Sequence, residues 1–192
     1  PKQDQWVFGG FTQGEVESDW LNKIKEQFKW RLGHCYPLAK QLLSPVYSSG
    51  FVRDFLRTLN ADEELIADLG CGTKRYKQSV VCIDGVGYPN VHIVADLERL
   101  PLRDESFDGM ISIAVLEHTL RPQDHVREMM RVLRPGGRVL CYIPFIQGFH
   151  ASPQDYQRYT VSGIRELFRE FEIIQVCPGG GPTSGMLWVL QE

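Results

Sequence analysis

Hydrophobic residues follow two different patterns from about residue 46 to the C-terminus. Short runs rich in β-branched residues are typical of strands buried on both faces. Between them, apolar residues recur three and four positions apart, which is the spacing of an amphipathic helix. We expect strands at 65–70, 80–85, 91–97, 107–118, 137–145 and 171–176. We expect helices at 48–59, 122–133 and 160–171.

This alternation of buried strands with amphipathic helices predicts the fold class. It indicates an α/β domain with a doubly wound, mostly parallel sheet. The two connections at 73–79 and 85–90 are too short for the usual crossover helix. One face of that half of the sheet should therefore be thinly covered, and we expect the N-terminal segment or a second copy of the chain, in a homodimer, to cover it.

The first 45 residues differ from the rest because they are rich in aromatic side chains. Apolar spacing predicts a helix at 18–32, with Ser18 as its N-cap. We therefore divide the chain into a helical N-terminal extension, residues 1–45, and one domain, residues 46–192. The segment 186–191 is either a seventh strand or the start of a helix in a chain truncated at its C-terminus.

Bulk composition narrows the function classes. The formal charge is −3 and the sequence pI is about 6.0, so nothing general favours nucleic-acid binding. No apolar run approaches the roughly 18 residues of a membrane span. The five cysteines are widely spaced without a Cys-x-x-Cys pair, which argues against a disulfide framework or a zinc site. We expect a cytoplasmic protein with no metal and no nucleic-acid partner.

Acidic residues end three successive predicted strands, at Asp68, Asp84 and Asp96. In a parallel sheet these carboxylates line one rim, where such folds bind ligands. Gly70 and Gly72 let backbone N–H groups approach a ligand, but Arg75 stands where a dinucleotide fingerprint needs its third glycine. A cation near Asp68, a ribose diol on Asp84 and a purine amine on Asp96 together describe S-adenosylmethionine.

The stretches "DLGCGT", "CIDG", "VADLERLPLRDESFDGMISIAVLEH" and "REMMRVLRPGGRVLCYIPF" occur in this order. They resemble the class I S-adenosylmethionine-dependent methyltransferases, specifically the type 11 methyltransferase domain, over about 66–145. This resemblance implies a cofactor site that holds the methionine end on the glycine loop, the ribose after the second strand, and the adenine after the third. The implied cofactor residues are Asp68, Gly70, Cys71, Gly72, Asp84, Gly85, Asp96, Leu97, Ala114 and Val115.

The tail from His150 carries the pattern His-x-x-Pro-x-Asp-Tyr-x-Arg-Tyr-Thr. It is similar to a subgroup of these enzymes that is often bacterial and linked to polysaccharide or lipid-glycan pathways. We expect Tyr156, Arg158 and Tyr159 to contact the acceptor, and His150 to act as general base. The alternative is that Arg158 pairs with Asp155 and the tyrosines only wedge the loop.

The leading hypothesis is therefore a methyltransferase acting on a small-molecule, glycan or lipid-linked acceptor, at oxygen or nitrogen. No Asn-Pro-Pro-Tyr-type motif follows the fourth strand, which disfavours methylation of nucleic-acid nitrogens. A non-catalytic scaffold that keeps the fold is the alternative. A nicotinamide oxidoreductase is a third hypothesis, which Arg75 disfavours.

Overall fold

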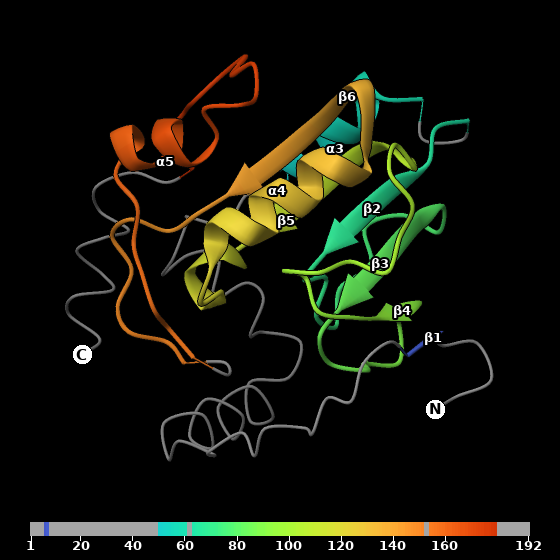
Figure 1. Cartoon of the computed structure of the whole chain (residues 1–192), viewed down its shortest axis with the longest axis horizontal. Helices are drawn as coiled ribbons and strands as arrows, with labels where there is room; N and C mark the ends of the chain where they lie inside the picture. Colours follow the sequence, from blue (N-terminus) through green and yellow to red (C-terminus); the bar gives the residue numbers. More distant parts are fainter. Residues whose placement is uncertain (1–5, 8–49, 61–62, 152–153, 180–192) are drawn as a thin grey trace.

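A computed structural model describes residues 6–7, 50–60, 63–151 and 154–179 (Figure 1). The strands are β1 (Trp6–Val7), β2 (Ile66–Leu69), β3 (Val80–Asp84), β4 (Ile93–Val94), β5 (Phe107–Ile113) and β6 (Leu133–Tyr142). The helices are α3 (Gly50–Thr58), α4 (Pro122–Val132), α5 (Val161–Leu167) and a short 3₁₀ turn, η2 (Leu116–His118). Within these residues no helix is long and apolar enough to cross a membrane.

The strands form one parallel sheet in the order β1-β4-β3-β2-β5-β6. The central strand β2 is buried along its whole length, and its Asp68 lies in register between Cys82 of β3 and Ile111 of β5. The chain builds outward from β2 in both directions, which places a topological switch point at its carboxyl end. The predicted doubly wound α/β fold is confirmed.

Helices cover both faces of the sheet (Figure 1). Alternate side chains of β2 point to opposite faces, so they pack against different helices. Ile66 packs with Val52 and Leu59 from the α3 region. Ala67 and Leu69 face the other way, into the core cluster that contains residues of α4 such as Met129. Both layers end near the carboxyl edge of the sheet, so that edge is left to loops.

The connections from β2 to β3 and from β3 to β4 contain no helix, as their length predicted. We expected the N-terminal segment, residues 1–45, to cover this half of the sheet, but the structure describes only Trp6 and Val7 of that segment. These two residues form β1 and add a parallel edge strand to β4. The predicted helix at 18–32 and the segment 186–191 lie outside the described residues.

One predicted strand is wrong and two others are much shorter than predicted. The strand expected at 107–118 ends at Ile113, and residues 116–118 form the turn η2. Residues 171–176 form no strand, and Ile174 is 82% exposed. A strand exists only through hydrogen bonds to a neighbour, and the sheet described here does not pair with this segment. The strand expected at 91–97 shrinks to Ile93–Val94, because Asp96 already begins a turn.

Candidate functional site

The glycine loop after β2 is held in a conformation that few other residues could adopt. Gly70 has φ +72° and Gly72 has φ +55°, in the left-handed region that glycine enters without strain. A Cβ atom on Gly70 would lie 2.4 Å from Cγ2 of Val115, which follows β5. The loop therefore packs its bare backbone directly under Val115, and two of the predicted cofactor residues meet there.

Asp84 and Asn90 fix the same loop through hydrogen bonds. The backbone N–H of Gly72 donates to Oδ2 of Asp84 at 2.8 Å, and the N–H of Val86 donates to Oδ1 at 2.8 Å. The side-chain amide of Asn90 donates to the carbonyls of Gly72 at 3.0 Å and Lys74 at 2.7 Å. The sequence analysis missed Asn90. The signal that could have found it is an amide side chain at the end of a connection that is too short for a helix.

Asp68 is the electrostatic focus of the site. Its side chain is buried at 2% exposure, and Oδ2 has no hydrogen-bond partner among the described residues. Burial, and then the nearby charge of Asp84, raises the pKa of Asp68 to about 7. A buried carboxylate oxygen without a partner is unfavourable unless a donor or cation approaches it. The arrangement therefore fits the cationic amino-acid end of S-adenosylmethionine.

Three other predicted cofactor residues take ordinary positions along the same rim. Asp96 is half-buried, and its Oδ1 accepts the N–H of Glu98 at 2.9 Å. Leu97 packs against the core, and a Cβ on Gly85 would make only a normal contact. The backbone bond from Ala95 to the Asp84 carbonyl, 3.0 Å, ties this turn to the end of β3. The turn with Asp96 and Leu97 is thus attached to Asp84, which in turn holds the glycine loop.

Cys71 and Ala114 complete the predicted set. Burial raises the pKa of the Cys71 thiol well above its usual range, so the side chain is a small apolar group. Ala114 has φ +55°, which is strained for a residue with a Cβ atom, and its N–H donates to the Tyr142 carbonyl at 2.9 Å. Such strained positions concentrate at functional sites.

The post-β6 loop, described at residues 143–151 and 154–160, forms a second region at the same edge of the sheet, and its Arg158 is paired within the loop. Both terminal nitrogens of Arg158 bond the carboxylate of Asp155, with Nη2–Oδ2 at 2.6 Å. Arg158 also donates to the carbonyls of Gln147 at 3.1 Å and Gly148 at 2.9 Å. This is the pairing that the alternative interpretation predicted, so Arg158 shapes the loop, and its contact with the acceptor stays a prediction.

The two predicted tyrosines behave differently. Tyr156 is 49% exposed, and its backbone N–H donates to the Glu117 carbonyl at 2.8 Å, which docks the loop onto η2. The hydroxyl of Tyr159 is buried and lacks a hydrogen-bond partner within the described part of the chain. Burial, and then the charge of Glu117, raises the pKa of Tyr159 to about 12.

His150 lies in a cluster with Glu117 and His118. Oε1 of Glu117 is 3.8 Å from Nε2 of His118 and 3.7 Å from Nε2 of His150. Glu117 is fully buried, and its burial raises the pKa of the carboxyl. Burial, and then the proximity of His118, lowers the pKa of His150. The sequence analysis named His150 but did not foresee its two neighbours.

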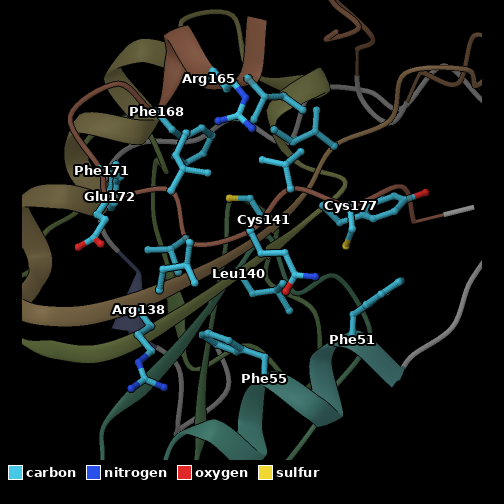
Figure 2. A pocket seen from close by; sticks show the side chains of 18 of the residues that line it. Phe51, Phe55, Arg138, Leu140, Cys141, Arg165, Phe168, Phe171, Glu172 and Cys177 are labelled. Atoms are coloured by element: carbon cyan, nitrogen blue, oxygen red, sulfur yellow. The ribbon is translucent and has the colours of Figure 1, made fainter. Parts of the chain in front are cut away.

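A large groove lies away from the glycine loop but extends to the post-β6 loop. It has a volume of about 1690 Å³ and lies between α3, β6, α5 and the segment 171–179. Figure 2 shows Phe55 of α3 on the same side of β6 as Leu140, whereas Cys141 lies on the side of Phe168. None of the predicted cofactor residues lines it, although Tyr159 does.

Comparison with known proteins identifies the class of enzyme. The family described as "Methyltransferase domain" matches residues 67–141. The chain is 42% identical over 108 residues to a protein of Homo sapiens named "Probable tRNA methyltransferase 9B", covering 48% of this chain and 24% of that protein. It is 31% identical over 131 residues to a tRNA (carboxymethyluridine(34)-5-O)-methyltransferase of Xenopus tropicalis, covering 60% of this chain and 20% of that protein. The chain thus spans about a quarter or less of the length of these relatives.

A solved structure shares the fold. It is the 1,6-didemethyltoxoflavin-N1-methyltransferase of Burkholderia thailandensis, crystallised with 1,6-didemethyltoxoflavin and S-adenosylhomocysteine. The TM-score is 0.51 at 16% identity, over 85% of this chain and 81% of that one. S-adenosylhomocysteine, bound in that protein, is the demethylated product of S-adenosylmethionine.

Two predictions about the acceptor are wrong. We expected a small-molecule, glycan or lipid-linked acceptor and no nucleic-acid partner, but the curated relatives are named tRNA methyltransferases. The net charge was a poor guide because it is a sum over the whole chain, whereas binding of a nucleic acid depends on the local surface. The non-catalytic scaffold gains no support from relatives that are named as enzymes. Residues 67–141 of the chain match the methyltransferase domain family.

Proposed function

We propose that this protein transfers a methyl group from S-adenosylmethionine to an oxygen atom of a modified uridine in tRNA, in the cytoplasm. The observation that carries the proposal is the 42% identity to a relative named as a tRNA methyltransferase. A second relative is named for an oxygen of carboxymethyluridine. The thiols of Cys71, Cys82, Cys141 and Cys177 are free, which agrees with a reducing compartment.

The cofactor half of the site supplies matching partners for S-adenosylmethionine. We assign the cationic amino group to the unpartnered oxygen of Asp68. We assign the ribose hydroxyls to Asp84, whose oxygens each accept one backbone N–H and keep a further lone pair. Asp96 is assigned the adenine amine. The cofactor supplies an already activated methyl group on its sulfonium sulfur.

The acceptor chemistry asks little of the protein beyond positioning. The carboxyl of a carboxymethyl group is ionised at neutral pH, so its oxygen is a nucleophile without a general base. Alignment of two bound reactants can supply most of the acceleration. An enzyme of this kind needs a rigid loop to hold the acceptor, and the paired charges of Arg158 and Asp155 supply one.

Exposed aromatic side chains on the post-β6 loop suit an RNA acceptor. Phe145 is 58% exposed, Phe149 is 72% exposed and Tyr156 is 49% exposed. Proteins recognise unpaired RNA bases largely by stacking them on such rings. A tRNA loop presents unstacked bases, so these three residues are proposed as its platform.

The test is methyl transfer from labelled S-adenosylmethionine by the full chain. We expect labelling of a tRNA whose uridine carries a carboxymethyl group, and none of the same tRNA without it. Asp84→Ala should abolish cofactor binding and labelling together. Phe149→Ala should raise KM for tRNA several-fold and leave the Kd for S-adenosylhomocysteine unchanged. The control Ile174→Ala should change neither constant. Failure to label the modified tRNA while S-adenosylmethionine binds would overturn the proposed acceptor.

A further inference from the structure

The cluster of Glu117, His118 and His150 has the composition and spacing of a metal site. One carboxylate oxygen and two imidazole nitrogens lie within 4.8 Å of one another. The residues come from two elements: η2 supplies Glu117 and His118, and the post-β6 loop supplies His150. Two imidazoles with one carboxylate are a ligand set that binds divalent transition metals, with positions left open for a further ligand.

Glu117 provides an independent reason to expect a cation. Its side chain has 0% exposure, and neither oxygen has a hydrogen-bond partner among the described residues. A buried carboxylate normally receives several hydrogen bonds or coordinates a metal, because the loss of hydration is otherwise uncompensated. Oε1 lies 3.8 Å from Nε2 of His118 and 3.7 Å from Nε2 of His150.

The distances favour tetrahedral over octahedral coordination. Ligands about 2.1 Å from a tetrahedral zinc ion are separated by about 3.4 Å, whereas octahedral neighbours are separated by about 3.0 Å. The two Glu117–histidine separations are 3.7 and 3.8 Å, so a small inward rotation of the rings completes the tetrahedral arrangement. The rings are edge-on to each other, with centroids 4.8 Å apart.

The remaining ring nitrogen of His118 is placed as that of a metal-bound histidine usually is. A histidine ligand normally donates its other N–H to a carbonyl or carboxylate, which fixes the ring. Nδ1 of His118 hydrogen-bonds the carbonyl of Gln154. Nδ1 of His150 lies 3.7 Å from Oδ2 of Asp155 and 3.5 Å from Nη2 of Arg158. The amide of Gln147, 3.5 Å from Nε2 of His150, is too distant to occupy that nitrogen strongly.

We propose that Glu117, His118 and His150 bind one zinc ion, with one coordination position open to a ligand oxygen. The ion would lie beside the transfer site, because Val115, two residues before Glu117, packs over Gly70 of the glycine loop. An anionic oxygen of the acceptor is the class of ligand that this position suits. That use of the ion rests on the proposed function, whereas the binding of zinc does not.

The experiment measures metal binding without using methyl transfer. The full chain, freed of metal with a chelator, is titrated with zinc and, separately, with cobalt. We expect one zinc ion per chain and a visible cobalt spectrum of tetrahedral type. Glu117→Gln should weaken zinc binding by about a hundredfold or more, since loss of even an outer-shell partner costs 10–100-fold. The control Cys177→Ser removes an exposed thiol away from the cluster and should bind zinc normally.

A second variant guards against misfolding of Glu117→Gln. His150 is partly exposed, so His150→Gln should fold, and zinc should raise the Tm of the wild type without raising that of the variant. Wild-type protein that binds no zinc at micromolar concentration would overturn the proposal. Equal zinc affinity in the wild type and both variants would overturn it as well. Zinc binding without tRNA methylation would instead refute only the proposed function.

Discussion

The two regions at the carboxyl edge of the sheet use their charged residues in opposite ways. On the glycine-loop side, Oδ2 of Asp68 has no partner among the described residues, and Asp84 accepts only backbone N–H groups. Neither carboxylate is paired with a cationic side chain by these contacts. On the post-β6 side, Asp155 and Arg158 neutralise each other and tie down the loop. The carboxylates of the first region are thus left open, whereas the Arg158–Asp155 pair of the second keeps the loop in shape.

The strongest test of this contrast is Arg158→Ala. Its partner Asp155 has a side chain that is only 3% exposed, so the variant leaves a buried carboxylate without its cation. We expect the free energy of unfolding to fall by about 3 kcal/mol. Arg158→Lys should recover little, because an ammonium cannot reproduce two parallel bonds to one carboxylate. Urea denaturation measures both.

Arg127→Ala is the matched control, because it removes an exposed pair instead. The side chain of Arg127 is 68% exposed and bonds Asp124 at 2.7 Å. We expect a change below about 1 kcal/mol in the free energy of unfolding. Equal losses in Arg127→Ala and Arg158→Ala would show that the post-β6 pairing has no special structural role.

Gly70→Ala tests the glycine-loop side. The added Cβ would overlap Val115 and hold alanine at φ +72°, so we expect a loss of about 1–3 kcal/mol and weaker binding of S-adenosylhomocysteine. Gly72→Ala meets no atom within 4 Å, so only the backbone strain of about 1 kcal/mol should remain. Adding Val115→Ala should restore part of the loss in Gly70→Ala but none in Gly72→Ala. Thermal denaturation and calorimetric titration provide the readouts.

The smallest expected effect is a pH dependence that belongs to the glycine-loop side alone. Asp68 has a pKa of about 7 in the protein without ligand, and a bound cation favours its ionised form. Below this pH the carboxyl must lose a proton on binding, so affinity for S-adenosylmethionine should fall by up to about tenfold per pH unit. Calorimetry between about pH 7 and pH 5.5 measures the slope. Asp68→Asn should bind more weakly and show a flat profile; an unchanged slope would assign the dependence to another group.

Sequence reasoning succeeded for the backbone. The spacing of Gly70 and Gly72 after a buried strand, and the acids at 68, 84 and 96, predicted that a glycine loop and three carboxylates lie along one edge of the sheet. These features depend on local conformation and strand order, both of which leave periodic signals. The strand predicted at 171–176 failed because pairing with a neighbour is not encoded in the segment itself.

The acceptor region could not be predicted in the same way. The Arg158–Asp155 pair was one of two open alternatives, since sequence spacing cannot say whether a charge turns inward or outward. Glu117 reaches His150 only because the post-β6 loop folds back onto η2 through the Tyr156–Glu117 backbone bond. Net charge excluded nucleic acid wrongly, because it says nothing about uncharged surface features such as the exposed ring of Phe149.

The pairing of β1 with β4 has a consequence for the order of folding. Trp6 pairs with Ile93, and α3, β2 and β3 all lie between them in the chain. Closing so long a loop is entropically unfavourable until the intervening strands are in place. The N-terminal strand should therefore join the sheet last and be the first to detach, with amide hydrogens that exchange faster than those of β2.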